Sequence, residues 1–137
     1  MKPHVTFLVD YPNWAFDFIA RSILIRLTNR FRFDIKYSSR DPILDPSATD
    51  LLYVFFWGEQ IYKGKGFEKR QIIKDIASWR WKYDEKYGCL TERTFVETHL
   101  SDCVCATTPS LEIFEQLSPH FSTLIHCPNG VESDYFS

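Results

Sequence analysis

The sequence has little glycine and lacks the glycine pattern of a dinucleotide-binding site. Only five of its 137 residues are glycine, and the loop expected after the first strand, "DYPNWAF", contains none of them. A Gly-x-Gly-x-x-Gly turn is what allows a backbone to approach a pyrophosphate closely. Its absence argues against an NAD or FAD enzyme, and we expect no cofactor.

A strong excess of one charge and a long apolar run are absent as well. Sixteen basic and eighteen acidic side chains are interspersed and give a net charge of −2. Such a chain has no field that attracts a polyanion, so nucleic acid is not an expected partner. The N-terminal stretch "VTFLV" spans only five residues before Asp10, which is too short for a signal-peptide core or a membrane span. We therefore expect a cytoplasmic protein with no transmembrane segment.

The usual signatures of catalysis and metal binding are missing. The four cysteines form no Cys-x-x-Cys pair, so we expect free thiols and neither a disulfide framework nor a zinc site. The four histidines show no His-Glu-x-x-His pattern, and no serine lies in a Gly-x-Ser-x-Gly elbow. We predict no catalytic residue and no metal ligand.

The sequence does contain enough apolar material for one packed core, with 45% hydrophobic residues. The first strand, "HVTFLV", precedes an amphipathic helix in "YPNWAFDFIARSILIRLTNRF", for which Asn13 is the expected N-cap. Further strands are expected in "FDIKYS", "LLYVFFW", "CVCATT" and "STLIHC". Helices are expected in "TERTFVETHLSD" and in "PSLEIFEQLS", the latter with Thr108 as N-cap and Pro109 as its first residue.

Strands that alternate with helices across short loops predict right-handed crossovers and a mostly parallel sheet with helices on both faces. The expected fold class is therefore α/β, a Rossmann-like three-layer sandwich. The unbroken apolar run "LLYVFFW" is typical of a strand covered on both faces. Periodicity leaves one segment open, because Ile72 to Ser78 fits a helix or a short buried strand.

Ligands of such sheets bind beyond the carboxyl ends of the strands, here residues 10–16, 57–60, 78–84 and 108–110. In "SWRW", residues 78–81, an Arg between two Trp residues offers flat surfaces and a fixed charge, which suits a sugar face or a phosphate. Alternatively, one Trp belongs to the core and the rest forms a solvated rim. Glu59 either hydrogen-bonds a ligand hydroxyl or faces water.

The run "SDCVCATTPSLEIFEQLSPHFSTLIHCPNGVESDYF" resembles the end of the N-terminal domain of GT-B-fold glycosyltransferases, in particular the retaining nucleotide-sugar enzymes of glycosyltransferase family four. In that family a strand, a helix and a second strand lead to Pro-Asn-Gly-Val-Asp, followed shortly by Phe. Pro128, Asn129, Gly130 and Val131 match this turn, and Glu132 replaces the Asp. The opening "VTFLVDYPNWAFDFIARSIL" and "SWRW" are also similar to a subgroup, so the resemblance covers nearly the whole chain.

The resemblance implies a strand from Ile72 to Ala77 and a loop over residues 78–88. In the family, that loop and the first βα loop contact the acceptor. Carried over by position, together with strand-end residues, the acceptor-binding candidates are Asp10, Trp14, Glu59, Ser78, Trp79, Arg80 and Trp81. The His that often ends the fourth strand in the family is not matched here, so a His-dependent contact is not supported.

The resemblance also implies a division of labour. Residues 1–127 would form the acceptor-side domain, which binds a sugar or a lipid-linked acceptor, and residues 128–137 would begin the interdomain connector. The family's C-terminal domain binds the nucleotide-sugar donor with a Glu-x₇-Glu pair, which this chain lacks. The expected function is acceptor binding in a glycosyltransferase that retains configuration. We expect this chain to lack the nucleotide-sugar domain and to be inactive alone, and the complete enzyme to be cytoplasmic or peripheral at the membrane.

Other functions stay open. A stand-alone Rossmann-like module would bind a sugar, a phosphate or a partner without catalysis. Another α/β nucleotide enzyme with an unrecognised site is disfavoured by the missing glycine motifs. The final turn has two interpretations as well, because Asn129-Gly130 could close a hairpin. The stretch "VESDYF" has little to bury, however, so we expect Pro128, Asn129 and Gly130 to lead the chain out of the sheet.

Overall fold

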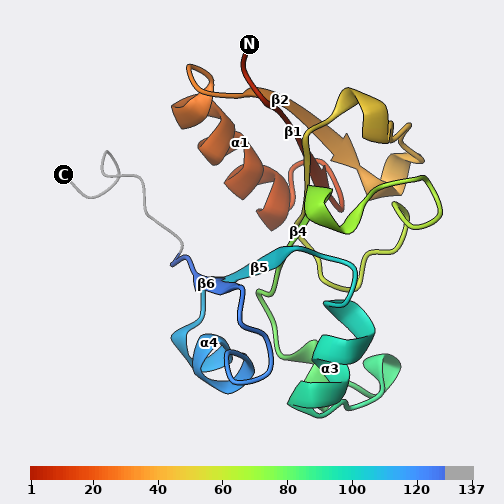
Figure 1. The fold of residues 1–137 in the computed structure, drawn as a ribbon, viewed down its shortest axis with the longest axis vertical. Coiled ribbons are helices and arrows are strands. Elements are labelled where there is room, and N and C mark those ends of the chain that lie inside the picture. The colour runs from red at the N-terminus through yellow and green to blue at the C-terminus, as the bar shows by residue number, and fades with distance from the viewer. Residues whose placement is uncertain (129–137) are drawn as a thin grey trace.

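The computed structural model describes residues 1–128, which form an α/β fold around one six-stranded sheet (Figure 1). The strands are β1 (His4–Val9), β2 (Arg32–Tyr37), β3 (Leu51–Val54), β4 (Ile72–Asp75), β5 (Cys105–Thr108) and β6 (Leu124–His126). Their order is β2-β1-β3-β4-β5-β6, and every neighbouring pair is parallel. The predicted fold class, a Rossmann-like sandwich with a parallel sheet, is confirmed.

Four α-helices and four short 3₁₀ helices connect the strands. The α-helices are α1 (Ala15–Leu27), α2 (Arg80–Tyr83), α3 (Glu92–His99) and α4 (Leu111–Leu117). The 3₁₀ helices are η1 (Ser38–Arg40), η2 (Pro46–Ala48), η3 (Lys69–Gln71) and η4 (Glu85–Tyr87). Within the described part of the chain, no helix is long and apolar enough to cross a membrane.

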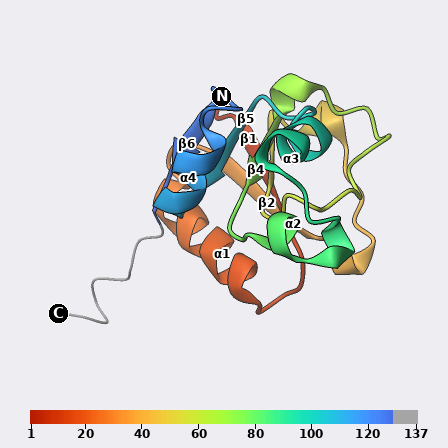
Figure 2. The same cartoon turned by 90° about the horizontal axis from the view of Figure 1, so that it is seen from below.

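Two apolar clusters lie on opposite faces of the sheet. On one face α1 packs on β1, where Ala20 meets Phe7 and its neighbours. On the other face α3 and α4 cover the central strands, and Phe95 and Ile113 join Leu52 in the larger cluster. Figure 2 shows α1 and α3 on opposite sides of the strands. The alternation along each strand produces this division, since successive side chains point to opposite faces.

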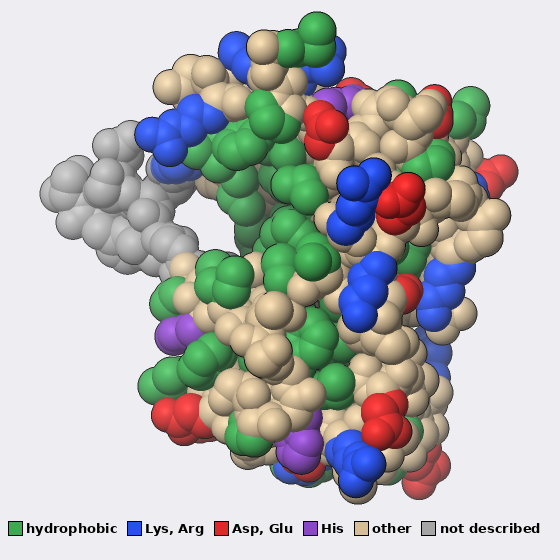
Figure 3. All heavy atoms as spheres, in the orientation of Figure 1, with side chains coloured by type: hydrophobic (Ala, Val, Ile, Leu, Met, Phe, Trp, Pro, Cys, Tyr) green, Lys and Arg blue, Asp and Glu red, His purple; other side chains and the backbone are tan. Residues whose placement is uncertain are grey.

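Only part of the α1 face is covered in the described residues. Ile73 and Cys105, which are opposite each other in the β4–β5 register, are half-buried there, and Ile125 on β6 is 50% exposed. Figure 3 shows hydrophobic side chains in the hollow between the upper and lower parts of the molecule. Such incomplete cover among the described residues is unusual for a parallel sheet, because both faces are normally covered by crossover helices.

The two central strands are shorter than their apolar runs predict. β3 ends at Val54 and alternates between buried and half-buried residues, so the expectation of full cover on both faces is wrong for Leu51 and Tyr53. β4 is a strand, which settles the segment that periodicity left open, but it ends at Asp75 and not at Ala77.

Two predicted helix starts are wrong by a residue or two. Helix α1 begins at Ala15 with Trp14 at the N-cap position, while Asn13 lies outside it in the left-handed region with φ 66°. Helix α4 begins at Leu111 because the hydroxyl of Ser110, and not that of Thr108, accepts the N–H of Ile113.

The chain leaves the sheet after β6 through Cys127 and Pro128, both exposed. Asn129 and Gly130, and with them nearly all of the proposed connector, lie outside the described residues.

Candidate ligand-binding edge

The carboxyl ends of β1 and β3 mark the point where the order of the sheet reverses. From β1 the chain passes through α1 to β2 on one side, whereas β3 to β6 follow one another on the other side. Connections that leave neighbouring strands in opposite directions open a crevice that binds ligands in α/β proteins. Residues 10–14 follow β1 and residues 55–60 follow β3 at this switch point.

The loop after β1 presents an aromatic pair to solvent. The rings of Tyr11 and Trp14 lie 4.3 Å apart between centroids, and the two residues are 47% and 56% exposed. Asp10 precedes them, and its carboxylate accepts the N–H of Tyr11 at 2.8 Å. Exposed rings on a hydrogen-bonded turn are suited to stacking on the apolar face of a sugar.

Asp17 fixes the shape of this loop. Its fully buried carboxylate accepts the N–H of Asn13 at 2.8 Å and the hydroxyl of Tyr37 at 2.9 Å, and it pairs with Arg21 at 2.8 Å. A buried carboxylate is tolerated only when it is paired and hydrogen-bonded. Asp17 is thus the anchor of the first loop.

The "SWRW" segment divides between core and surface. Trp81 is fully buried and stacks on Phe95, with ring centroids 4.4 Å apart and planes 20° apart. It therefore presents no ring to a ligand, which contradicts its prediction as an acceptor contact. The alternative that one Trp belongs to the core is the arrangement observed, and the physical reason is the turn of α2, which points residue 81 inward.

Trp79 and Arg80 remain at the surface. Trp79 is half-buried, Arg80 is exposed, and together with Tyr83, Asp84 and Glu85 they line an open hollow. The loop predicted over residues 78–88 thus contains the short helices α2 and η4. The ammonium of Lys82 lies 5.5 Å from the centre of the Trp79 ring, within the range of a cation–π contact.

Ser78 and Glu59 serve the loops themselves. The Ser78 hydroxyl accepts the indole N–H of Trp57 at 3.4 Å, which ties the end of β4 to the loop after β3. The Glu59 carboxylate accepts the backbone N–H groups of Gln60 and Ile61 at 2.9 and 3.4 Å. Both side chains are therefore already bonded within the fold.

Asp75, near the carboxyl end of β4, is a candidate that the sequence reasoning missed. The hydroxyl of Thr107 donates to its carboxylate at 2.8 Å, and Tyr53 in turn bonds Thr107 at 2.6 Å. Burial raises the pKa of Asp75 to about 6. Asp75 is opposite Thr107 in register, and Tyr53 is opposite Ile73, which lies two residues before Asp75 on the same face of β4. The three residues therefore share the incompletely covered sheet face. The signal that could have revealed it is an Asp two residues after Ile73, at a strand position that shares a face with that apolar residue.

A buried ion pair lies on the opposite face of β4. Lys74 is fully buried, and its ammonium pairs with Asp102 at 2.8 Å and donates to the carbonyl of His99 at 2.6 Å. The hydroxyl of Tyr62 donates to the other oxygen of Asp102 at 2.5 Å. Burial lowers the pKa of Lys74. Because the ammonium and the Tyr62 hydroxyl are bonded within the core, we assign this group a structural role.

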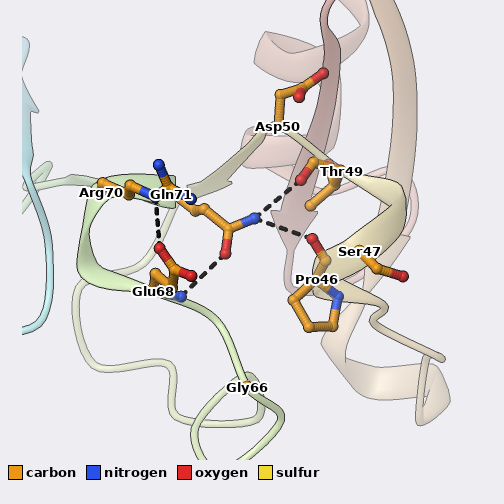
Figure 4. Close-up of a pocket in the computed structure, with 8 residues that line it drawn as sticks. All are labelled: Pro46, Ser47, Thr49, Asp50, Gly66, Glu68, Arg70 and Gln71. Atoms are coloured by element: carbon orange, nitrogen blue, oxygen red, sulfur yellow. Dashed lines mark hydrogen bonds and ion pairs between the residues drawn. The ribbon is translucent and has the colours of Figure 1, made fainter.

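A polar hollow also lies at the amino ends of β3 and β4, opposite the ligand-binding edge (Figure 4). The side-chain amide of Gln71 donates to the carbonyls of Pro46 and Thr49 at 3.0 and 2.9 Å, and its oxygen accepts the N–H of Glu68. Arg70 pairs with Glu68. These groups bond to one another, so the hollow braces two strand starts and offers little to a ligand.

The described residues contain no group of three or more His, Cys, Asp or Glu side chains placed to hold a metal ion. The four cysteines are free thiols; Cys103 is buried, Cys105 is half-buried, and Cys89 and Cys127 are exposed. Comparison of the chain with protein-family models, with curated proteins and with solved structures gives no match.

Proposed function

We propose that the chain is the acceptor-binding domain of a glycosyltransferase that transfers a sugar from a nucleotide-sugar donor with retention. The observation that carries this proposal is the Tyr11–Trp14 pair beside the β1–β3 switch point. Exposed aromatic rings at the ligand-binding edge of a sheet are a typical platform for a sugar ring, whose C–H face packs on them. The α/β fold with a parallel sheet and the resemblance around Pro128 are consistent with this function.

The loop after β4 adds a second contact for the same acceptor. Strands of a sheet lie about 4.8 Å apart, so the ends of β1 and β4, with β3 between them, lie about 10 Å apart. A disaccharide or a sugar phosphate spans such a distance. Arg80 and the Trp79–Lys82 contact lie at the second end, where a guanidinium suits a phosphate. We therefore propose an acceptor with an anionic or lipid-phosphate group beyond its sugar.

The chain's own role in the reaction is to position the acceptor. Orientation of an acceptor hydroxyl supplies a large part of the rate enhancement in group transfer. Donor binding and stabilisation of the leaving diphosphate are assigned to groups outside this sequence, because the sequence contains no Glu-x₇-Glu pair. Free cysteines are typical of a reducing compartment, and we place the protein in the cytoplasm.

Saturation-transfer NMR with mono- and disaccharides tests the proposal on the 137-residue chain. We expect Trp14→Ala to abolish the transfer signal and Trp14→Phe to retain part of it, because a phenyl ring still stacks. Leu111→Ala is the matched control, since Leu111 is a comparably exposed apolar residue on α4. Absence of binding to the unaltered chain, or equal signals from Trp14→Ala and the unaltered chain, would contradict the proposal.

A second test concerns the donor. We expect neither hydrolysis nor transfer when the chain is incubated with UDP- or GDP-sugars and the released nucleotide is measured. Turnover of either donor by these residues alone would refute the assignment of donor chemistry to another domain.

A further inference from the structure

Another hollow lies at the amino ends of β4 and β5, on the edge of the sheet opposite the Tyr11–Trp14 pair. Its volume is about 350 Å³, which is within the range of small-molecule sites. The loop between β3 and η3 forms one wall, and the turn between α3 and β5 forms the other. The residues that line it include Lys63, Gly64, Phe67, Lys69, Ser101 and Asp102.

The backbone of the first wall has the form of an anion-binding nest. Residues 61–66 form a turn, and the sign of φ alternates along "KGKG", because Gly64 and Gly66 have φ 76° and 94° whereas Lys63 and Lys65 have negative φ. Successive N–H groups in such a turn make a concavity that binds anions. The N–H groups of residues 64–67 have no hydrogen-bond partner among the described residues, so they are available to a ligand.

Two lysines bring positive charge to the same hollow. Lys63 and Lys69 are exposed, and neither ammonium has a hydrogen bond or an ion pair within the described part of the chain. Burial lowers the pKa of His99, and the charges of Lys74 and Lys63 lower it further. The Lys63 ammonium is therefore held within electrostatic range of the buried ion pair behind the wall.

The acidic residue that lines the hollow does not cancel this charge. The carboxylate of Asp102 pairs with the Lys74 ammonium at 2.8 Å and accepts the hydroxyl of Tyr62 at 2.5 Å. Its negative charge is thus already balanced by a buried lysine that a ligand does not reach. The two exposed lysines of the lining remain uncompensated.

The other acidic residues at this edge lie outside the lining. Glu68 pairs with Arg70, and both line the neighbouring polar hollow together with Asp50. The carboxylate of Glu59 accepts two backbone N–H groups of its own loop. Residues 59–70 contain four basic and two acidic side chains, so the charge of the whole segment is positive even when both acids are counted.

We propose that this hollow binds the phosphate group of a small phosphate ester. A phosphate monoester carries about two negative charges at pH 7 and has three strong acceptor oxygens. These match the two ammonium groups, the free N–H groups of residues 64–67 and the hydroxyl of Ser101. The hollow is larger than a phosphate group needs, and Phe67 and Ile72 line the rest of it. The group esterified to the phosphate is therefore apolar.

An NMR titration of the isotope-labelled 137-residue chain tests the proposal, with inorganic phosphate and phenyl phosphate as the probes. We expect saturable shifts of the amide signals of residues 64–67 with both probes, and none with chloride at equal ionic strength. Phenyl phosphate should bind roughly three- to tenfold more tightly than inorganic phosphate, because its ring packs against Phe67.

Four variants separate a built site from general charge attraction. Lys63→Gln and Lys69→Gln should each weaken phosphate binding roughly five- to tenfold, because each removes a charge-assisted hydrogen bond. Gly64→Ala keeps both lysines but disfavours the positive φ, and it should weaken binding by a similar factor. Lys65→Gln is the matched control, since Lys65 is an exposed lysine of the same loop outside the lining, and it should change binding by about twofold or less.

Three results would count against the site. The absence of saturable shifts at residues 64–67 would overturn the proposal, provided that the amide spectrum shows a folded chain. Equal weakening by Lys63→Gln and Lys65→Gln would also overturn it, because the attraction would then be a general effect of the charge of the loop. A phenyl phosphate affinity no higher than that of inorganic phosphate would refute the apolar ester group.

This inference does not depend on the proposed function. The hollow lies at the amino ends of the strands, whereas Tyr11, Trp14 and Arg80 follow the carboxyl ends. Amide shifts at residues 64–67 report on the hollow, and shifts at residues 79–83 report on the acceptor edge. Phosphate that shifts only the amides of residues 79–83 would refute the site in the hollow and leave the acceptor proposal intact.

Discussion

Replacement of Trp81 by Ala tests the assignment of this residue to the core and not to a ligand surface. The indole is fully buried, stacks on Phe95 at 4.4 Å, and lies 5.6 Å from the ring of Trp79. Its N–H has no hydrogen-bond partner among the described residues. The substitution removes a large apolar volume from the centre of the α2–α3 packing and leaves a cavity that the backbone can only partly fill.

The expected cost follows from these contacts. Replacement of a buried Trp by Ala in a core costs about 3–5 kcal/mol. The unpartnered N–H disappears with the ring, which returns about 1 kcal/mol or more of its desolvation cost, so we place the loss near 3 kcal/mol. A domain has a free energy of unfolding of only about 5–15 kcal/mol, which makes this a large part of the total. Trp81→Phe, which keeps a ring and removes the N–H, should cost about 1 kcal/mol.

Urea unfolding monitored by circular dichroism measures the effect. With a slope of about 2 kcal/mol per molar urea, the midpoint of Trp81→Ala should fall by about 1.5 M. Trp79→Ala is the matched control, because Trp79 is half-buried at the neighbouring surface, and it should lower the midpoint by about 0.5 M or less. Equal midpoints for the two Ala variants, or a loss below about 1 kcal/mol at residue 81, would refute the core assignment.

Three further predictions concern charged groups in the fold. Burial raises the pKa of Asp75 from 3.8 to about 6, so the folded state disfavours the ionised carboxylate. The free energy of unfolding should therefore fall by up to roughly 3 kcal/mol as the pH rises from about 4 to above 6. Asp75→Asn should remove this pH dependence from urea midpoints measured across that range. Asp102→Asn should lower the free energy of unfolding by about 3–5 kcal/mol, because it leaves the fully buried Lys74 ammonium unpaired. Lys74→Met should lower it less, since the remaining Asp102 carboxylate is 32% exposed and water can solvate it. Equal urea midpoints for these two variants would contradict this asymmetry. Asp17→Ala should lower the free energy of unfolding by about 3 kcal/mol. It should also loosen the first loop, which would appear as faster amide hydrogen exchange at Asn13. Unchanged exchange at Asn13 would argue against the anchor role of Asp17.

The alternation of strands and helices could be predicted because it is carried by local periodicity. The strand in "HVTFLV" and the helix in "TERTFVETHLSD" were predicted correctly, because the sheet face or helix side that they bury requires the apolar spacing of these runs. The first and last residues of the helices and strands were harder to predict from the sequence. Trp14, and not the predicted Asn13, is the N-cap residue of α1. The reason is that the buried Asp17 carboxylate accepts the backbone N–H of Asn13, in an arrangement that includes the Tyr37 hydroxyl from another strand.

The candidate site was predictable as a set of loops but not residue by residue. The order of elements placed residues 10–16 and 78–84 at one edge of the sheet, whereas the inward turn of Trp81 depends on α2 packing against Phe95. The Tyr53–Thr107–Asp75 chain was inaccessible, because it needs the register of three strands far apart in sequence. Side-chain roles that depend on the pairing of strands far apart in the sequence leave no pattern in the local sequence.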